Sequence, residues 1–130
     1  MQSAFSIPLF LKAKLEFEHK YQRHIRKMDE RLEQKIIASR LPSVDPELNR
    51  QLVSFVHGLR TLDLKKAPAI SETIDWARSL VLLKANQLDR QLVRDTLNVL
   101  LKFEQDIEAA QEALPELLKP ISSIGSRALN

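Results

Sequence analysis

Residues 70–80 of the chain, ISETIDWARSL, gather most of the side chains that could do chemistry. A serine, two acids, the only tryptophan and an arginine lie in this short stretch. Ser71 is typical of a helix N-cap, which predicts that a helix begins here and turns Trp76 toward a core. Arg78 then falls on the opposite flank and projects across the surface. The plainer interpretation of Arg78 is an ordinary surface ion pair, which stabilises a protein little.

One Glu-x-x-His motif, Glu16 to His19, has the spacing that places two metal ligands on one helix face. Di-iron helical bundles need two such motifs and two further glutamates. The other histidines, His24 and His57, have no glutamate three residues before them. A lone motif of this kind does not predict a metal site.

Two kinds of catalytic or phosphate-binding motif are missing from the sequence. There is no cysteine and no Gly-x-Ser-x-Gly elbow, so neither a thiol nor a serine nucleophile is predicted. Neither Gly58 nor Gly125 belongs to a Gly-Lys-Ser/Thr sequence, which excludes the glycine-rich loop that cradles ATP phosphates. We therefore expect the isolated chain to be catalytically inert.

Basic residues recur at helical steps before residue 40 and form a stripe made of Lys20, Arg23, Lys27 and Arg31. Such a stripe can meet phosphates or an acidic partner, which gives an alternative function, a stand-alone helical binding module that contacts nucleic acid or an acidic protein. The plainer interpretation is a solvated helix flank with local acids. It is favoured because no interleaved aromatic residues offer base stacking, so nucleic acid is not the expected partner.

The apolar pattern predicts helices and no strands. A helical stretch from Leu9 to about Arg40 carries one apolar stripe, formed by Tyr21, Ile25, Met28, Leu32 and Ile36. Pro42 ends it, because proline removes a backbone donor. Residues 62–68 read as a linker between later helices. The N-caps expected for these helices are Asp45, Ser71 and Asp89.

The predicted fold class is all-α, a small bundle of four to five helices. Three parts are expected: a helical N-terminal extension over 1–28 with no assigned role, a helical domain over 29–110, and a flexible tail over 111–130, where prolines, serines and a glycine accumulate. No stretch approaches the roughly 18 apolar residues of a membrane span, and the cytoplasm is the expected compartment.

The stretches LRTLDLKKAP (59–68) and ISETIDWA (70–77) resemble the C-terminal part of MoxR-type AAA+ ATPases. Within that family they are most similar to the carbon-monoxide-dehydrogenase-accessory branch, with its pattern LR-x-LDL-x-K-x-P-x-(V/I)-x-ET-(L/I)-DWA. Upstream, IIASRLP (36–42) is similar to the branch's II-x-x-R-(V/L)-P. The resemblance covers about 29–106, and residues 62–77 are its specific part.

In that family this segment is a helical lid, which closes over nucleotide and often supplies a sensor arginine to the phosphates. The resemblance implies that 29–110 is an AAA+ lid-like domain that contributes to ATP binding and couples hydrolysis to protein remodelling or metalloenzyme maturation. Arg78 is the candidate sensor arginine. The Walker A and B motifs are missing, so ATP and Mg²⁺ would bind only together with a core domain. The implied partners are that core domain or neighbouring subunits, and a von Willebrand factor A-type protein.

Overall fold

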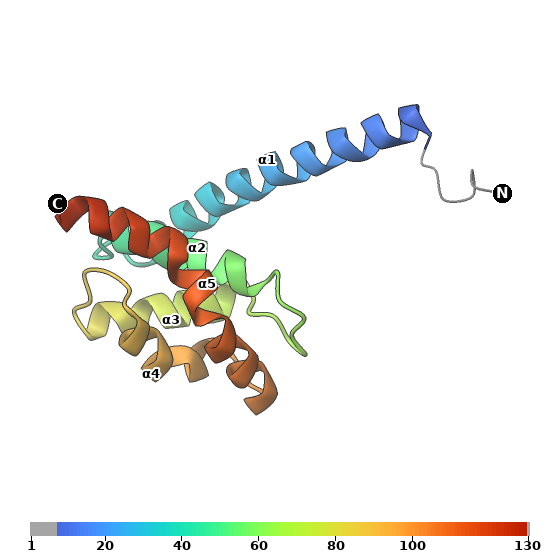
Figure 1. The fold of residues 1–130 in the computed structure, drawn as a ribbon. Coiled ribbons are helices and arrows are strands. Elements are labelled where there is room, and N and C mark those ends of the chain that lie inside the picture. The colour runs from blue at the N-terminus through green and yellow to red at the C-terminus, as the bar shows by residue number, and fades with distance from the viewer. Residues whose placement is uncertain (1–7, 130) are drawn as a thin grey trace. The chain divides into compact units, whose positions relative to one another are not determined.

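The computed structural model describes residues 8–129, and for 10, 15, 17–28 and 122–129 only their place in a helix. All regular structure in this described part is helical, which confirms the all-α class (Figure 1). The helices are α1 (Leu9–Arg40), α2 (Pro46–Leu59), α3 (Ile70–Leu82), α4 (Arg90–Leu100) and α5 (Glu104–Leu129). The chain divides into two units, 1–32 and 33–130, so only the last turns of α1 belong to the helical bundle.

Two of the predicted N-caps are confirmed. The Asp45 carboxylate accepts hydrogen bonds from the backbone N–H groups of Glu47 and Leu48, both at 3.1 Å, and Pro46 occupies the first turn of α2. Asp89 accepts from the Leu92 N–H at 2.8 Å at the start of α4. These caps satisfy backbone donors that no helical carbonyl can reach, which is why short polar residues fix both helix starts.

The predicted Ser71 cap is wrong. The helix begins at Ile70 with Ala69 as its N-cap and no side-chain cap, and the Ser71 hydroxyl bonds the Glu72 carboxylate instead. Thr73 anchors this start, because its hydroxyl donates to the Ala69 carbonyl at 3.0 Å. The Thr73 hydroxyl also accepts from Arg60, so a tertiary contact sets the first turn of α3.

Trp76 is a core residue, as the sequence predicts. It is fully buried and its ring lies 5.5 Å from that of Phe55, centroid to centroid, at a tilt of 42°. Its indole N–H donates to the Thr96 hydroxyl at 2.7 Å, and the same hydroxyl donates to the Leu92 carbonyl at 2.8 Å. Thr96 thus satisfies the one polar group of the largest core side chain and ties α3 to α4.

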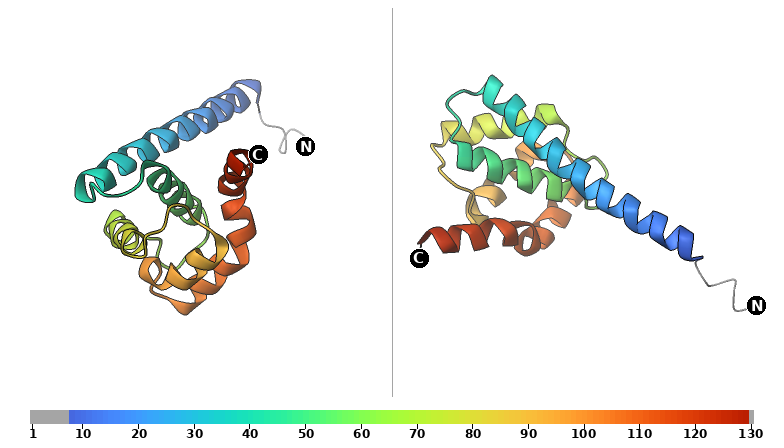
Figure 2. Two further views of the ribbon diagram at one scale, coloured as in Figure 1. Left: turned by 90° about the vertical axis from the view of Figure 1, so that its left-hand side faces the viewer. Right: turned by 90° about the horizontal axis from the view of Figure 1, so that it is seen from above.

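Helix α5 covers the bundle where a loose tail was expected. It contacts α2 and α4 and changes direction along its length (Figures 1 and 2). Leu114, Leu118 and Ile121 are buried in its inner face, so the expected tail over 111–130 is helical through residue 129. The sequence predicts a tail here because it contains Pro115 and Pro120. In the structure, burial of the apolar face of α5 outweighs the hydrogen bonds that these two prolines remove.

The expected apolar stripe of α1 is wrong at its C-terminal end. Leu32 is 57% exposed and Ile36 is only half-buried, whereas Ile37 is fully buried in the core. Tyr21, Ile25 and Met28 lie outside the residues whose side chains are described. In the described part of the chain, no helix is both long and apolar enough to cross a lipid bilayer.

The Trp76–Thr96 hydrogen bond gives the first testable prediction. Thr96→Val should lower the free energy of unfolding by about 1–3 kcal/mol, because the indole N–H loses its acceptor inside the core. Thr96→Ser keeps the hydroxyl and should cost clearly less. Chemical denaturation of the three proteins checks this, and equal losses in the two variants would contradict a role for the hydrogen bond.

Candidate functional site

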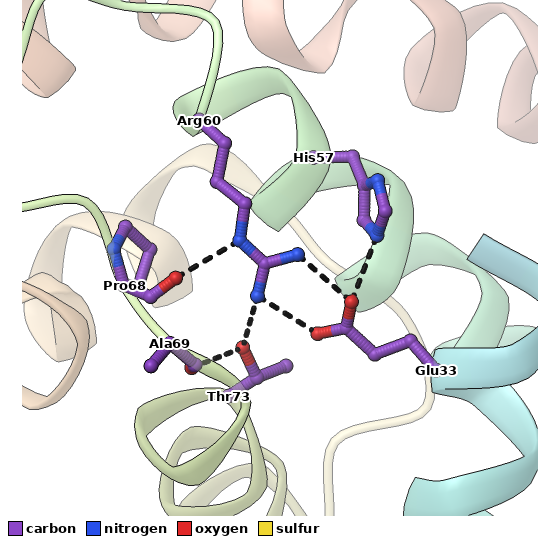
Figure 3. Close-up of polar contacts among 6 residues, drawn as sticks. All are labelled: Glu33, His57, Arg60, Pro68, Ala69 and Thr73. Carbon is purple, nitrogen blue, oxygen red and sulfur yellow. Dashed lines mark hydrogen bonds and ion pairs between the residues drawn. The ribbon is translucent and has the colours of Figure 1, made fainter. Parts of the chain in front are cut away.

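The Arg60 side chain lies at the centre of the junction between α2 and α3 (Figure 3). Its Nε donates to the Pro68 carbonyl at 2.9 Å. Its Nη1 and Nη2 donate to the two carboxylate oxygens of Glu33 at 2.8 and 3.0 Å, and Nη2 also reaches the Thr73 hydroxyl at 3.3 Å. One guanidinium therefore joins the end of α1, the linker and the first turn of α3. We call Glu33, His57, Arg60, Pro68 and Thr73 the Arg60 cluster.

Glu33 is the buried anion of this cluster. Its side chain is 7% exposed, and its Oε1 lies 2.8 Å from both His57 Nε2 and Arg60 Nη1. Burial alone would raise the pKa of Glu33, but hydrogen bonds from His57 and Arg60 and attraction to the Arg60 charge outweigh it and lower the pKa to about 2. Glu33 is therefore ionised at neutral pH, and both of its oxygens are engaged.

The geometry of the Arg60 cluster favours a positioning role over catalysis. The bidentate pair with Glu33 fixes the plane of the guanidinium, and two further N–H donors bond Pro68 and Thr73. A guanidinium engaged in this way has little capacity left for an incoming phosphate. The cluster instead fixes where α3 begins relative to α2, which sets the direction of the helix that carries Arg78.

A second buried carboxylate anchors the linker over 61–69. Asp106, in the first turn of α5, is 2% exposed and accepts from the backbone N–H groups of Lys65 and Lys66 at 2.8 and 3.0 Å. The Lys65 ammonium lies 4.4 Å from the centroid of the Phe103 ring. The linker is therefore held near its middle by α5 and near its C-terminal end by Arg60.

Arg78, the candidate sensor arginine, lies on the exposed face of α3. Its side chain is 54% exposed and makes an ion pair with Asp75 at 3.4 Å, one turn earlier. Such an exposed pair is weak and costs little to break. The guanidinium can therefore be recruited by an anion that approaches this face, and its nucleotide role stays a prediction.

The basic stripe is only partly within the described side chains. Arg31 is exposed, while Lys20, Arg23 and Lys27 lie outside the residues whose side chains are described. Glu16 is exposed, and His19 of the Glu-x-x-His motif also lies outside that set. Among the described residues, no group of three or more potential ligands is placed to hold a metal ion.

Sequence reasoning missed the residues that form the junction. The sequence predicts no distant partner for Glu33, Arg60 or Asp106. Arg60 pairs with a residue 27 positions away, and Asp106 bonds a backbone some 40 positions away. One signal was present: Glu33 stands four residues before the buried Ile37, which puts both on the inward face of the helix.

The lowered pKa of Glu33 predicts a pH-dependent stability. Its carboxylate stabilises the fold above its unfolded pKa of 4.5, and this contribution falls as the pH drops toward about 2. Wild type should exceed Glu33→Gln by about 3 kcal/mol in free energy of unfolding at neutral pH. The gap should narrow between pH 4.5 and 2. Denaturation across this range checks it, with the exposed Glu16→Gln as the control. A gap that does not change with pH would contradict the ion-pair account.

The Asp106 anchor predicts a local effect on the linker. Asp106→Asn should speed amide hydrogen exchange at Lys65 and Lys66 by about tenfold or more, because one N–H loses a charged acceptor. The exposed Glu108→Gln, two residues away on the same helix, is the matched control. Unchanged exchange at both amides would show that Asp106 does not hold the linker in solution.

No protein-family model, curated protein or solved structure matches the chain in the three comparisons made.

Proposed function

We propose that this chain is the helical lid of a MoxR-type AAA+ ATPase. In this role residues 29–110 would close over ATP held by a core domain and couple its hydrolysis to the remodelling of a client protein. The proposal starts from the resemblance of residues 59–77 to that family's lid segment. Metalloenzyme maturation and a von Willebrand factor A-type partner belong to the same proposal.

One observation supports it most: several residues that carry the resemblance bond one another at a single junction. Arg60 of the LR pair donates to the Pro68 carbonyl and to the hydroxyl of Thr73, the threonine of the ET pair. Trp76, from the DWA end, donates to Thr96 in the core. Three residues of the pattern, Arg60, Pro68 and Thr73, thus form a connected set of contacts, which gives a physical reason for their occurring together.

A lid needs such a junction. Domain closure moves packed helices as rigid bodies about a few hinge residues. If the connection between α2 and α3 were flexible, the lid could not transmit that movement to its other helices. The linker between α2 and α3 is held at Pro68 by Arg60 and at Lys65 by Asp106. Helices α2 and α3 can therefore move together, and a displacement at α3 reaches α5 through the same contacts.

Arg78 is the side chain that would meet the nucleotide. A guanidinium stabilises phosphate charge through paired, charge-assisted hydrogen bonds. Arg78 leaves only an exposed ion pair with Asp75 when it turns toward a phosphate, so recruitment has a low cost. The core domain would supply the Walker motifs and Mg²⁺, because residues 1–130 contain no glycine-rich phosphate loop.

ATP turnover of the assembly with the core domain tests Arg78. Arg78→Ala should lower turnover by about tenfold or more, because a hydrogen bond to a charged group contributes about 1.5–3 kcal/mol. Lys119→Ala is the matched control, since Lys119 is exposed and also pairs with an acid one turn away, at 3.7 Å. Circular dichroism should show both variants folded.

Unchanged turnover in Arg78→Ala would remove Arg78 from the nucleotide site. The lid proposal itself fails separately, if the wild-type chain has no effect on ATP binding or turnover by any MoxR-type core domain of its own genome.

A further inference from the structure

A small pocket lies between α4 and α5, away from the Arg60 cluster and Arg78. It measures about 100 Å³, and its lining residues are Arg90, Arg94, Gln111, Glu112, Leu114 and Pro115. A cavity of about 10–15 Å³ already holds one water, so the pocket has room for several waters. That space is enough for one tetrahedral oxyanion.

Two arginines on one helix face supply the positive charge of this pocket. Arg90 is the first residue of α4 and Arg94 follows one turn later, and both are exposed. Within the described part of the chain, neither side chain has a hydrogen bond or ion pair. The neighbouring acids are engaged elsewhere: Asp89 caps the helix, and Asp95 accepts from Gln91 at 2.8 Å.

These two arginines differ from the other arginines whose contacts are described above. Arg60 and Arg78 each have a carboxylate partner. Two guanidiniums at i, i+4 spacing repel each other, and neither forms an ion pair with the nearby Glu112, so a bound dianion would relieve this repulsion. The N-terminus of α4 adds a partial positive charge beside Arg90.

Helix α5 forms the other wall. Pro115 has no N–H, so the carbonyl of Gln111 lacks the donor that normally bonds it four residues later. Helices commonly bend at such a proline, and α5 changes direction along its length (Figure 2). Leu114 is 1% exposed and gives the pocket an apolar side. Glu112 contributes the one negative charge.

We propose that this pocket binds a phosphate group, held by the guanidiniums of Arg90 and Arg94. Each guanidinium offers a planar pair of donors, and a tetrahedral phosphate has enough oxygens to accept from both at once. Glu112 opposes this binding by charge repulsion and limits its affinity. The site does not depend on the proposed lid function, and its phosphate can be free inorganic phosphate or the terminal phosphate of a nucleotide.

Titration of the isotope-labelled full chain with inorganic phosphate, at constant ionic strength, tests the site by nuclear magnetic resonance. Saturable shifts are expected at the amides of Arg94, Gln111 and Leu114. Arg90→Gln/Arg94→Gln should weaken binding at least about tenfold, because charge-assisted hydrogen bonds are lost. Lys12→Gln/Lys14→Gln removes the same charge from two exposed lysines of α1 and should leave it unchanged.

Glu112→Gln should tighten phosphate binding, since it removes the opposing charge. A parallel titration with ATP distinguishes the sources: the same amides shift at lower concentration if the pocket takes a nucleotide's terminal phosphate, and only with inorganic phosphate if it takes the free ion. No saturable shift with either probe would overturn the proposal. Equal weakening in both double variants would also overturn it, because that result indicates unspecific charge attraction.

Discussion

The ion pair between Arg60 and Glu33 is the contact on which the rest of the bundle depends. Glu33 brings a negative charge into a nearly closed site, and burial of an unpaired carboxylate would be costly. Arg60 compensates that charge and His57 adds a hydrogen bond, and two further donors of Arg60 fix the Pro68 carbonyl and Thr73. Removing either partner would leave a buried charge uncompensated. The position of α3 is thus linked to the last turns of α1 and the end of α2.

The same principle holds in two loops of the bundle. In each, a buried polar side chain from a helix accepts from backbone donors: Asp106 serves the linker over 61–69, and Gln51 accepts from the Leu88 N–H at 2.8 Å before α4. Loops tied in this way keep their helices in a fixed relation. In the proposed lid, this rigidity would let nucleotide-dependent movement at Arg78 reach α4 and α5 as one displacement.

Local patterns predicted much of the fold. The sequence predicts the caps Asp45 and Asp89 because each accepts from a backbone N–H no more than three positions away. It predicts a buried Trp76 because that side chain is large and apolar. Predictions failed where distant contacts decide the outcome. The start of α3 follows Thr73 and its contact with Arg60 rather than Ser71, and α5 stays helical through Pro115 because its apolar face is buried. The Arg60 cluster joins residues far apart in sequence, so spacing did not reveal it.

In the proposed function, the chain is the lid of an AAA+ assembly and contributes to ATP binding and hydrolysis. The most direct measurement is to tag its gene in the source cells, purify the native polypeptide or complex that contains these residues, and assay it for ATP hydrolysis. The lid proposal predicts ATP turnover together with a Walker-motif domain, in the same polypeptide or in a stoichiometric partner. Purified material without such a domain and without ATP turnover would contradict it.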